Sequence, residues 1–180
     1  MAQSTFVPAK AVAGKSRWPR LSNRRSAACD DDAFVLRAGS AGDLQAVYAL
    51  NRSCFEEYWS VGSLVSALES GYDLLICEQD GELAGYLLTL TVVDEIQVMQ
   101  IAVAPSFRRR GVARLLSEAL VAGADGIATV TLEVRLSNIP ARRLYAALGF
   151  AETGYRKQYY APNAAGICED AVLMDLQLPS

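Results

Sequence analysis

The first candidate functional segment of this chain is a basic turn between a β-like run and a helix-like run of residues. The segment reads Ile101-Ala102-Val103-Ala104-Pro105-Ser106-Phe107-Arg108-Arg109-Arg110-Gly111-Val112-Ala113-Arg114. The first N–H groups of a helix lack intrahelical partners and lie at the positive end of its dipole, so they bind anions. Gly111 and Ala113 leave the approach open. The segment predicts a pyrophosphate site, and the alternative is an ordinary basic turn before a surface helix.

A second candidate is Glu133, which lies between Leu132 and Val134 in an otherwise apolar run. A carboxylate there faces a cleft, is paired, or is the solvent-facing residue of an alternating strand. The chain contains no histidine, which excludes Ser–His–Asp hydrolysis, Cys–His pairs and imidazole metal sites. Proton transfer then falls to Glu, Asp, Tyr, Lys, Cys or water. Glu133 is therefore the candidate general base.

Composition narrows the class of protein. The 180 residues, 52% of them hydrophobic, fit one compact domain with a real core. No run approaches the roughly 18 apolar residues of a membrane helix. The net charge is −3, and residues 1–29 carry +6, so residues 30–180 carry −9. An acidic body suits a basic substrate and argues against nucleic-acid binding. Four widely spaced cysteines indicate free thiols in a reducing cytosol: Cys29, Cys54, Cys77 and Cys168.

Hydrophobic periodicity then gives the elements that must position these groups. Asp80-Gly81 indicates a hairpin turn, and Ser40 with Asp43 indicates a helix cap. Strands are predicted at 34–37, 72–78, 83–93, 95–103, 127–134, 150–160 and 169–178, and helices at 41–57, 60–68, 111–124 and 140–148. The order predicts one mixed α/β domain over 34–180. Residues 1–33 are expected to be a disordered basic extension, with a targeting peptide or a misassigned start as alternatives.

The Arg108-x-x-Gly111-x-Ala113 pattern after a strand resembles the coenzyme A-binding motif of the GNAT acetyltransferase superfamily. The resemblance extends over about residues 34–178. Within the superfamily the chain is similar to the RimI branch, whose members acetylate the N-terminal alanine of a small-subunit ribosomal protein. The segments that carry it are Leu132-Glu133-Val134-Arg135, Ser137-Asn138, Leu144-Tyr145, Leu148-Gly149-Phe150, Tyr159-Tyr160 and Glu169-Asp170-Ala171.

This resemblance implies a GNAT fold, which is a mixed, mostly antiparallel sheet with helices on both faces, splayed near the thioester. It implies direct acetyl transfer from acetyl-coenzyme A in a ternary complex, without a metal. Glu133 would accept the amine proton and Tyr145 would donate to the departing sulfur, although Tyr145 could instead be a packing aromatic. The expected coenzyme contacts are Ile101, Ala102, Val103, Arg108, Arg109, Arg110, Gly111, Val112, Ala113, Arg114 and Asn138, and the expected substrate contacts are Trp59, Tyr159 and Tyr160.

One segment departs from the branch. RimI-like chains carry Phe-Pro-Trp-Ser, whereas residues 55–60 read Phe-Glu-Glu-Tyr-Trp-Ser, so the proline is missing and the loop is longer. This loop is expected to line the peptide groove, so the departure concerns the acceptor and not the coenzyme. A cytoplasmic monomer without membrane or nucleic-acid contacts is expected. The rival hypotheses are a GNAT enzyme acting on a polyamine or aminoglycoside, and a non-catalytic acetyl-coenzyme A-binding module.

Overall fold

The computed structural model describes residues 33–162 and 166–179. Residues 1–32 of the predicted extension, Cys29 among them, therefore lie outside the described residues. The elements in chain order are β1 (Val35–Ala38), a 3-10 turn (Ala41–Asp43), α1 (Leu44–Cys54), α2 (Val61–Glu69), β2 (Asp73–Gln79), β3 (Glu82–Val92), β4 (Glu95–Val103), a second 3-10 turn (Pro105–Phe107), α3 (Val112–Ala122), β5 (Thr129–Arg135), α4 (Ile139–Ala147), β6 (Ala151–Tyr160) and β7 (Glu169–Gln177).

Local signals explain where these elements begin. Asp80 and Gly81 adopt positive φ angles of 53° and 78°, as a tight hairpin between β2 and β3 requires. Ser40 and Asp43 form the expected capping box, but it caps the 3-10 turn that precedes α1. The helix predicted at 41–57 is shorter than expected. It ends at Cys54 because Phe55 is extended, with φ −125° and ψ 138°.

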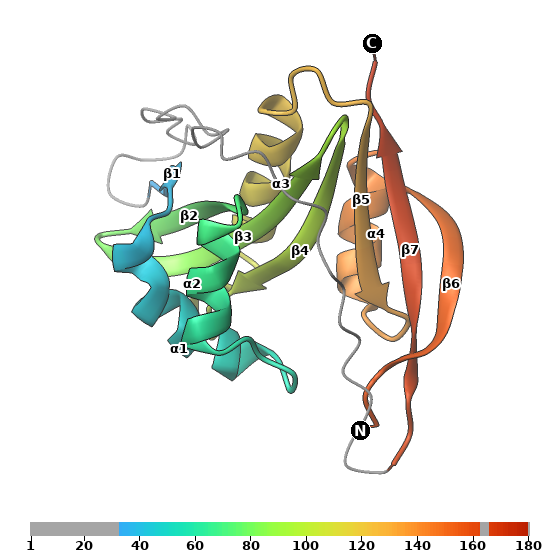
Figure 1. Ribbon diagram of the computed structural model, residues 1–180, viewed down its shortest axis with the longest axis horizontal. Coiled ribbons are helices and arrows are strands. Elements are labelled where there is room, and N and C mark those ends of the chain that lie inside the picture. The colour runs from blue at the N-terminus through green and yellow to red at the C-terminus, as the bar shows by residue number, and fades with distance from the viewer. Residues whose placement is uncertain (1–32, 163–165, 180) are drawn as a thin grey trace.

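The seven strands form one sheet in the order β1-β2-β3-β4-β5-β7-β6. All neighbours are antiparallel except β4 and β5, which are parallel. That parallel pairing covers only Glu95–Val98 against Thr129–Leu132. Beyond it the two strands diverge, as Figure 1 shows. Within the described part of the chain, the second half of β4 then has β3 as its one partner strand, and the end of β5 has β7.

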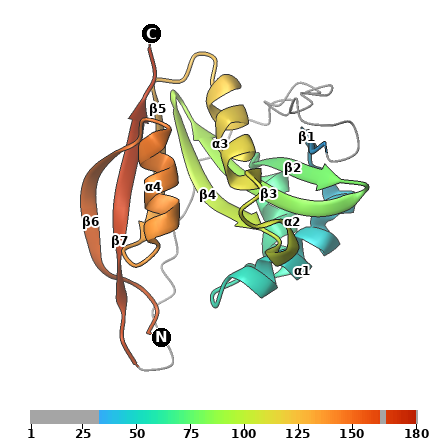
Figure 2. The same cartoon turned by 180° about the vertical axis from the view of Figure 1, so that it is seen from behind.

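Helices cover both faces of this sheet, which confirms the predicted GNAT arrangement. Helices α1 and α2 lie on one face, and α3 and α4 lie on the other (Figures 1 and 2). The α1–α2 face buries Val47, Leu64 and Tyr86, each at most 1% exposed. The α3–α4 face buries Leu116, Val130 and Met174 to the same degree. No described helix is long and apolar enough to span a bilayer, and the three described cysteines are free thiols.

Candidate active site

The basic turn lies where the sequence places it, between β4 and α3. Gly111 is the N-cap of α3, with φ +88°. A Cβ at Gly111 would meet no atom within 4 Å. The glycine is therefore required by its left-handed backbone conformation rather than by crowding. The first bond of the helix runs from the Leu115 N–H to the Gly111 carbonyl at 2.9 Å. The three preceding N–H groups, those of Val112, Ala113 and Arg114, thus lack intrahelical partners, as an anion site requires.

The arginines of this turn do not act alike. Arg108 folds back, with Nε 3.3 Å from the Val103 carbonyl oxygen and a guanidinium nitrogen 3.6 Å from Cys54 Sγ. The Arg110 guanidinium lies 5.2 Å from the Phe34 ring centroid and 5.3 Å from that of Phe107. These cation–π contacts pack the turn against Phe34, which immediately precedes β1.

The remaining two predicted arginine contacts lie at the surface. Arg109 is exposed and has a positive φ of 64°, and Arg114 is exposed with a guanidinium nitrogen 3.5 Å from Glu118. Arg108 and Arg110 are exposed as well, so all four guanidinium groups lie at the surface around the start of α3. Direct contacts of the four arginines with the coenzyme stay predictions.

The end of β4 offers one hydrogen-bonding edge. Ile101, Ala102 and Val103 pair with Leu87, Tyr86 and Gly85 of β3, while β5 has already diverged. An extended ligand with amides can add to such an edge like a strand. Gly85 was missed from the sequence. A Cβ there would lie 2.7 Å from the Ala102 carbonyl oxygen and 2.9 Å from a Val112 methyl carbon, so the glycine lets α3 approach the sheet.

On the other side of the divergence, Glu133 projects from β5 and is paired rather than solvated. Its Oε1 lies 3.0 Å from a guanidinium nitrogen of Arg156 on β6, and its side chain is 25% exposed. Burial, followed by an interaction with the Glu133 carboxylate, raises the pKa of Tyr159 to about 12. Burial and the Glu133 charge likewise raise the pKa of Tyr160 to about 12. The predicted base and both predicted substrate tyrosines therefore share one environment.

Tyr145 belongs to the same cluster. It lies on α4, only 6% exposed, with its ring 5.7 Å from that of Phe150. Burial, and then the proximity of Tyr160, raises the pKa of the Tyr145 hydroxyl above its ordinary value, which keeps the phenol protonated as a donor must be. The packing role considered for Tyr145 and its donor role are compatible. Asn138 caps α4, since its side-chain oxygen accepts from the Ala141 N–H at 3.3 Å.

The loop between α1 and α2, residues 55–60, spans the divergence. Its Glu57 carboxylate accepts the Ala161 N–H at 2.9 Å, just beyond β6. Its Glu56 carboxylate lies 3.8 Å from the Arg135 guanidinium of β5. Arg135 in turn lies 4.2 Å from the Tyr160 ring centroid. The segment that departs from the RimI-like pattern therefore forms a wall of the acceptor side.

A buried polar network holds this loop and was also missed from the sequence. The Asn51 side-chain oxygen accepts the Trp59 N–H at 3.0 Å, and its Nδ2 donates to the Tyr86 hydroxyl at 2.7 Å. The Tyr86 hydroxyl donates to Gln100 Oε1 at 3.0 Å. Asn51 is fully buried. The sequence signal that could have identified Asn51 as buried is its position directly after Leu50, on the apolar stripe of α1.

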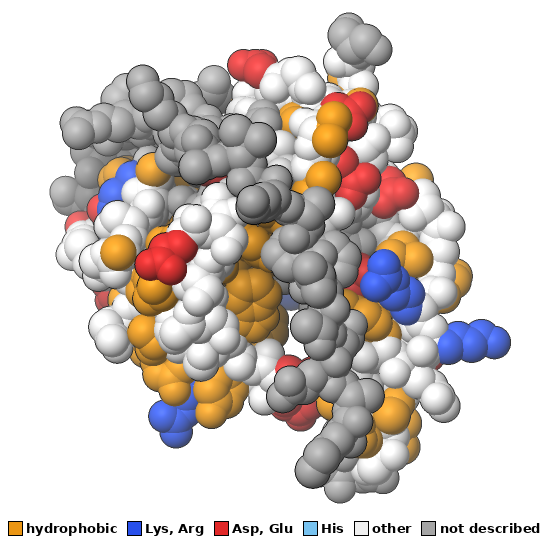
Figure 3. All heavy atoms as spheres, in the orientation of Figure 1, with side chains coloured by type: hydrophobic (Ala, Val, Ile, Leu, Met, Phe, Trp, Pro, Cys, Tyr) orange, Lys and Arg blue, Asp and Glu red, His pale blue; other side chains and the backbone are white. Residues whose placement is uncertain are grey.

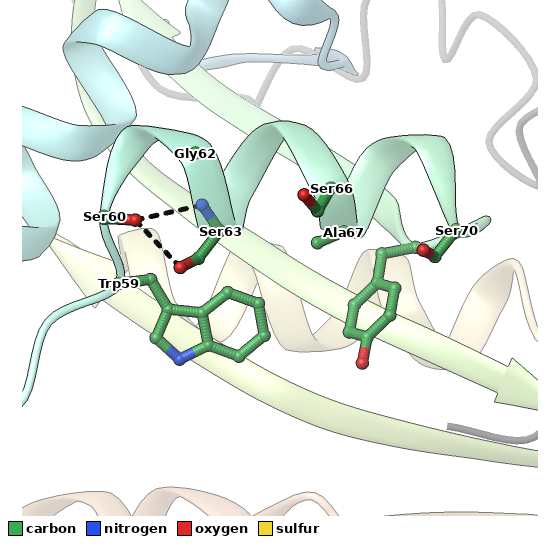
Figure 4. A pocket seen from close by; sticks show the side chains of 8 residues that line it. Trp59, Ser60, Gly62, Ser63, Ser66, Ala67 and Ser70 are labelled. Atoms are coloured by element: carbon green, nitrogen blue, oxygen red, sulfur yellow. Dashed lines mark hydrogen bonds between the residues drawn. The ribbon is translucent and has the colours of Figure 1, made fainter. Parts of the chain in front are cut away.

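Trp59 has a different aromatic partner from the two predicted substrate tyrosines. It lines an open hollow of about 530 Å³ beside α2, with the serines of that helix around it (Figure 4). Its ring packs edge-on against Tyr72 at 6.0 Å, whereas Tyr159 packs against Tyr160 at 5.2 Å. Among the described residues, the ring contacts thus divide the three predicted substrate aromatics between two places.

The arrangement joins an unpaired strand edge and an anion-binding turn to a carboxylate and a protonated phenol. The surface in Figure 3 shows basic side chains over β6, on the acceptor side. Arg156 and Lys157 of that strand are both exposed. The strand edge and the turn can hold a phosphorylated, amide-containing donor on one side, and the carboxylate and the phenol can receive an amine on the other.

Comparison with known proteins agrees with this geometry. The model of the Acetyltransferase (GNAT) family matches residues 44–150. The ribosomal protein bS18-alanine N-acetyltransferase of Escherichia coli strain K12 is 37% identical over 138 residues, which are 76% of this chain and 92% of that protein.

Solved structures show the same likeness. The crystal structure of the ribosomal-protein-S18-alanine N-acetyltransferase from Escherichia coli superposes with a TM-score of 0.77 and 34% identity, covering 82% of this chain and 95% of that one. A putative acetyltransferase from Salmonella typhimurium, solved with acetyl-CoA, superposes with a TM-score of 0.69 at 20% identity, covering 82% of this chain and 95% of that one. The latter likeness shows the fold alone.

Proposed function

The chain belongs to the GNAT acetyltransferase family, and we propose that it transfers the acetyl group of acetyl-coenzyme A to the N-terminal alanine amine of a small-subunit ribosomal protein. The relatives named for that activity match most of the chain. The observation that carries the proposal is the divergence of β4 and β5, which leaves the end of β4 without β5 as a partner. Glu133 lies on β5, Tyr160 is next to Glu133, and Tyr145 is next to Tyr160.

The residues on both sides have distinct tasks in this proposal. The N–H groups of Val112, Ala113 and Arg114 hold the pyrophosphate, and the edge of β4 holds the amide-containing arm. Acetyl-coenzyme A supplies an activated acyl group as its thioester. A backbone N–H of β4 polarises the thioester carbonyl.

On the acceptor side, Glu133 accepts a proton from the amine, directly or through water. Tyr145 donates to the departing sulfur, so the charge that develops there is met by a buried O–H. Transfer is direct, with no acyl-enzyme. We further propose that the protein acts as a cytoplasmic monomer and binds neither membrane nor nucleic acid.

The test is peptide acetylation with a free N-terminal alanine peptide and its N-blocked, lysine-containing copy. The wild type should label only the free N-terminus. Glu133→Gln should lower kcat/KM by about 10²-fold or more, as expected for loss of a general base. Glu152→Gln is the matched control, because Glu152 also pairs with an arginine, Arg142 at 2.6 Å, but outside the site.

Other outcomes point elsewhere. Equal labelling of the blocked peptide would indicate a lysine or broad-amine acetyltransferase. Turnover only with a polyamine or aminoglycoside would indicate the small-amine alternative. Binding of acetyl-coenzyme A without turnover on any amine would indicate a non-catalytic module. An unchanged rate in Glu133→Gln would contradict the assignment of the base.

A further inference from the structure

Arg156 is the one ion-pair partner that the structure records for the candidate base among the described residues. It lies on the edge strand β6, opposite Ala171 of β7, while Glu133 lies on β5, opposite Leu173 of the same strand. The Arg156 side chain therefore reaches across β7 to make its 3.0 Å contact. It is 55% exposed, and its guanidinium lies 5.4 Å from the Tyr159 ring centroid. Nothing in the proposed reaction so far uses this cation.

The other groups around Glu133 leave this cation as its immediate counter-charge. Tyr159 and Tyr160 are kept neutral by their raised pKa values. Arg135 is matched by Glu169 at 3.2 Å. The Glu57 carboxylate is engaged by the Ala161 N–H. The groups that interact with Glu133 are Arg156, Tyr159 and Tyr160, all from β6. The charged and titratable groups next to these tyrosines are Arg135 from β5, Glu169 from β7, Tyr145 from α4 and Glu57 from the α1–α2 loop.

The ion pair changes what Glu133 offers to an incoming amine. A lone carboxylate would attract any ammonium group. A carboxylate already paired with a guanidinium attracts a second cation much less, because the like charges repel. The site then favours an amine that arrives without its proton.

Amines differ strongly in how often they are neutral. An α-amine has a pKa near 7.7–8.0 and a lysine amine near 10.4, so at pH 7 about a tenth of the former but only about one in 2,500 of the latter is neutral. A site that accepts the neutral form therefore discriminates between them by on the order of 10²-fold from this cause alone.

We propose that Arg156 is a positioning residue that determines amine specificity. By holding Glu133 in an ion pair, it makes the site accept neutral amines and reject lysine side chains and other strongly basic amines. This inference rests on the proposed function, since it explains how the same site selects a protein N-terminus.

The test measures kcat/KM for the free alanine peptide and for its N-blocked lysine copy. Arg156→Gln should lower the ratio of the two values by about tenfold or more, within the 10²-fold limit set by the two amine pKa values. The bound ammonium is stabilised when the neighbouring positive charge is removed. Its pKa in the complex therefore rises, and the acid limb of kcat should move up by about one pH unit.

Two variants separate charge from structure. Arg156→Lys keeps the charge and should keep the ratio within about twofold of the wild type, as expected when the Coulomb contribution is retained. Lys157→Gln removes one positive charge from the next residue of β6, which is also exposed, whereas the recorded ion pair of Glu133 is with Arg156. It should leave both the ratio and the acid limb unchanged.

The proposal is overturned if Arg156→Gln leaves the ratio unchanged, if Arg156→Lys behaves like Arg156→Gln, or if Lys157→Gln has the same effect. The same ratio is measured with an α-amino amide and a primary alkylamine. If the wild type acetylates these small amines but no alanine peptide, the proposed function fails. The response of the small-amine ratio to Arg156→Gln then still decides the role of Arg156.

Discussion

The two sides of the β4–β5 divergence are built in different ways. In the proposed site, the coenzyme side relies on the backbone, namely the edge of β4, the left-handed Gly111 and the first N–H groups of α3. The proposed acceptor side relies on side chains from several elements, including Glu133 of β5, Tyr145 of α4 and Arg156 of β6. A backbone site depends on a short contiguous segment. A side-chain site depends on how distant segments pack, and it can change its acceptor while the coenzyme side stays the same.

The comparison is tested most strongly by Tyr145→Phe, on the acceptor side. A hydrogen bond to a charged group contributes about 1.5–3 kcal/mol, so loss of the donor should lower kcat by about 10- to 150-fold. The affinity for acetyl-coenzyme A, measured by calorimetry, should not change. The matched control is Tyr155→Phe, an exposed tyrosine whose hydroxyl donates to Glu152 at 3.0 Å. An equal loss of kcat in both variants would contradict the role of Tyr145.

Gly111→Ala tests the coenzyme side. The new methyl group meets no atom within 4 Å, but the residue must keep a φ of +88°, which costs a non-glycine residue about 1–2 kcal/mol. We expect the KM for acetyl-coenzyme A to rise about tenfold, because a shifted helix start loses about 1.4 kcal/mol of N–H contacts. The KM for the peptide should stay the same.

Gly81→Ala gives this experiment its control. Gly81 has a φ of +78° and an equally open Cβ position, but it lies in the β2–β3 hairpin. Both variants should lose about 2–8 °C in melting temperature. A normal KM for acetyl-coenzyme A in Gly111→Ala would show that the conformation of this residue does not matter for coenzyme binding.

Asn51→Leu should have the smallest effect on turnover, because Asn51 acts through the loop at residues 55–60. The change leaves the Trp59 N–H without its acceptor, at a cost of about 1–3 kcal/mol of stability. Thermal melting should show the loss, and the peptide KM should rise by roughly threefold, since about 0.7 kcal/mol of loop ordering is lost. Thr89→Val is the control, because Thr89 is also a buried polar residue but lies on β3. It should lower stability without changing the KM for the peptide or for acetyl-coenzyme A. A raised KM for acetyl-coenzyme A in Asn51→Leu would contradict the assignment of this loop to the acceptor side alone.

The sequence by itself determined the order of the elements, because that order depends on contacts that are local in the chain. The hairpin at Asp80-Gly81 and the start of α3 at Gly111 are set by φ angles that few residues adopt. The fold family came from the resemblance of the motifs to those of GNAT chains. The place of Glu133 between Leu132 and Val134 singled it out as a candidate base, and the resemblance gave Tyr145 its expected donor role.

Only the tertiary structure decided what surrounds those residues. Arg156 lies 23 positions from Glu133 in the chain and meets it only because β6 and β5 flank the same strand. Asn51 reads as one polar residue of a helix until Tyr86 and Gln100 are brought against it. Trp59 was grouped with the tyrosines by type, yet it packs beside α2. The charge next to the base and the shape of the acceptor wall follow from long-range packing, which no local periodicity encodes.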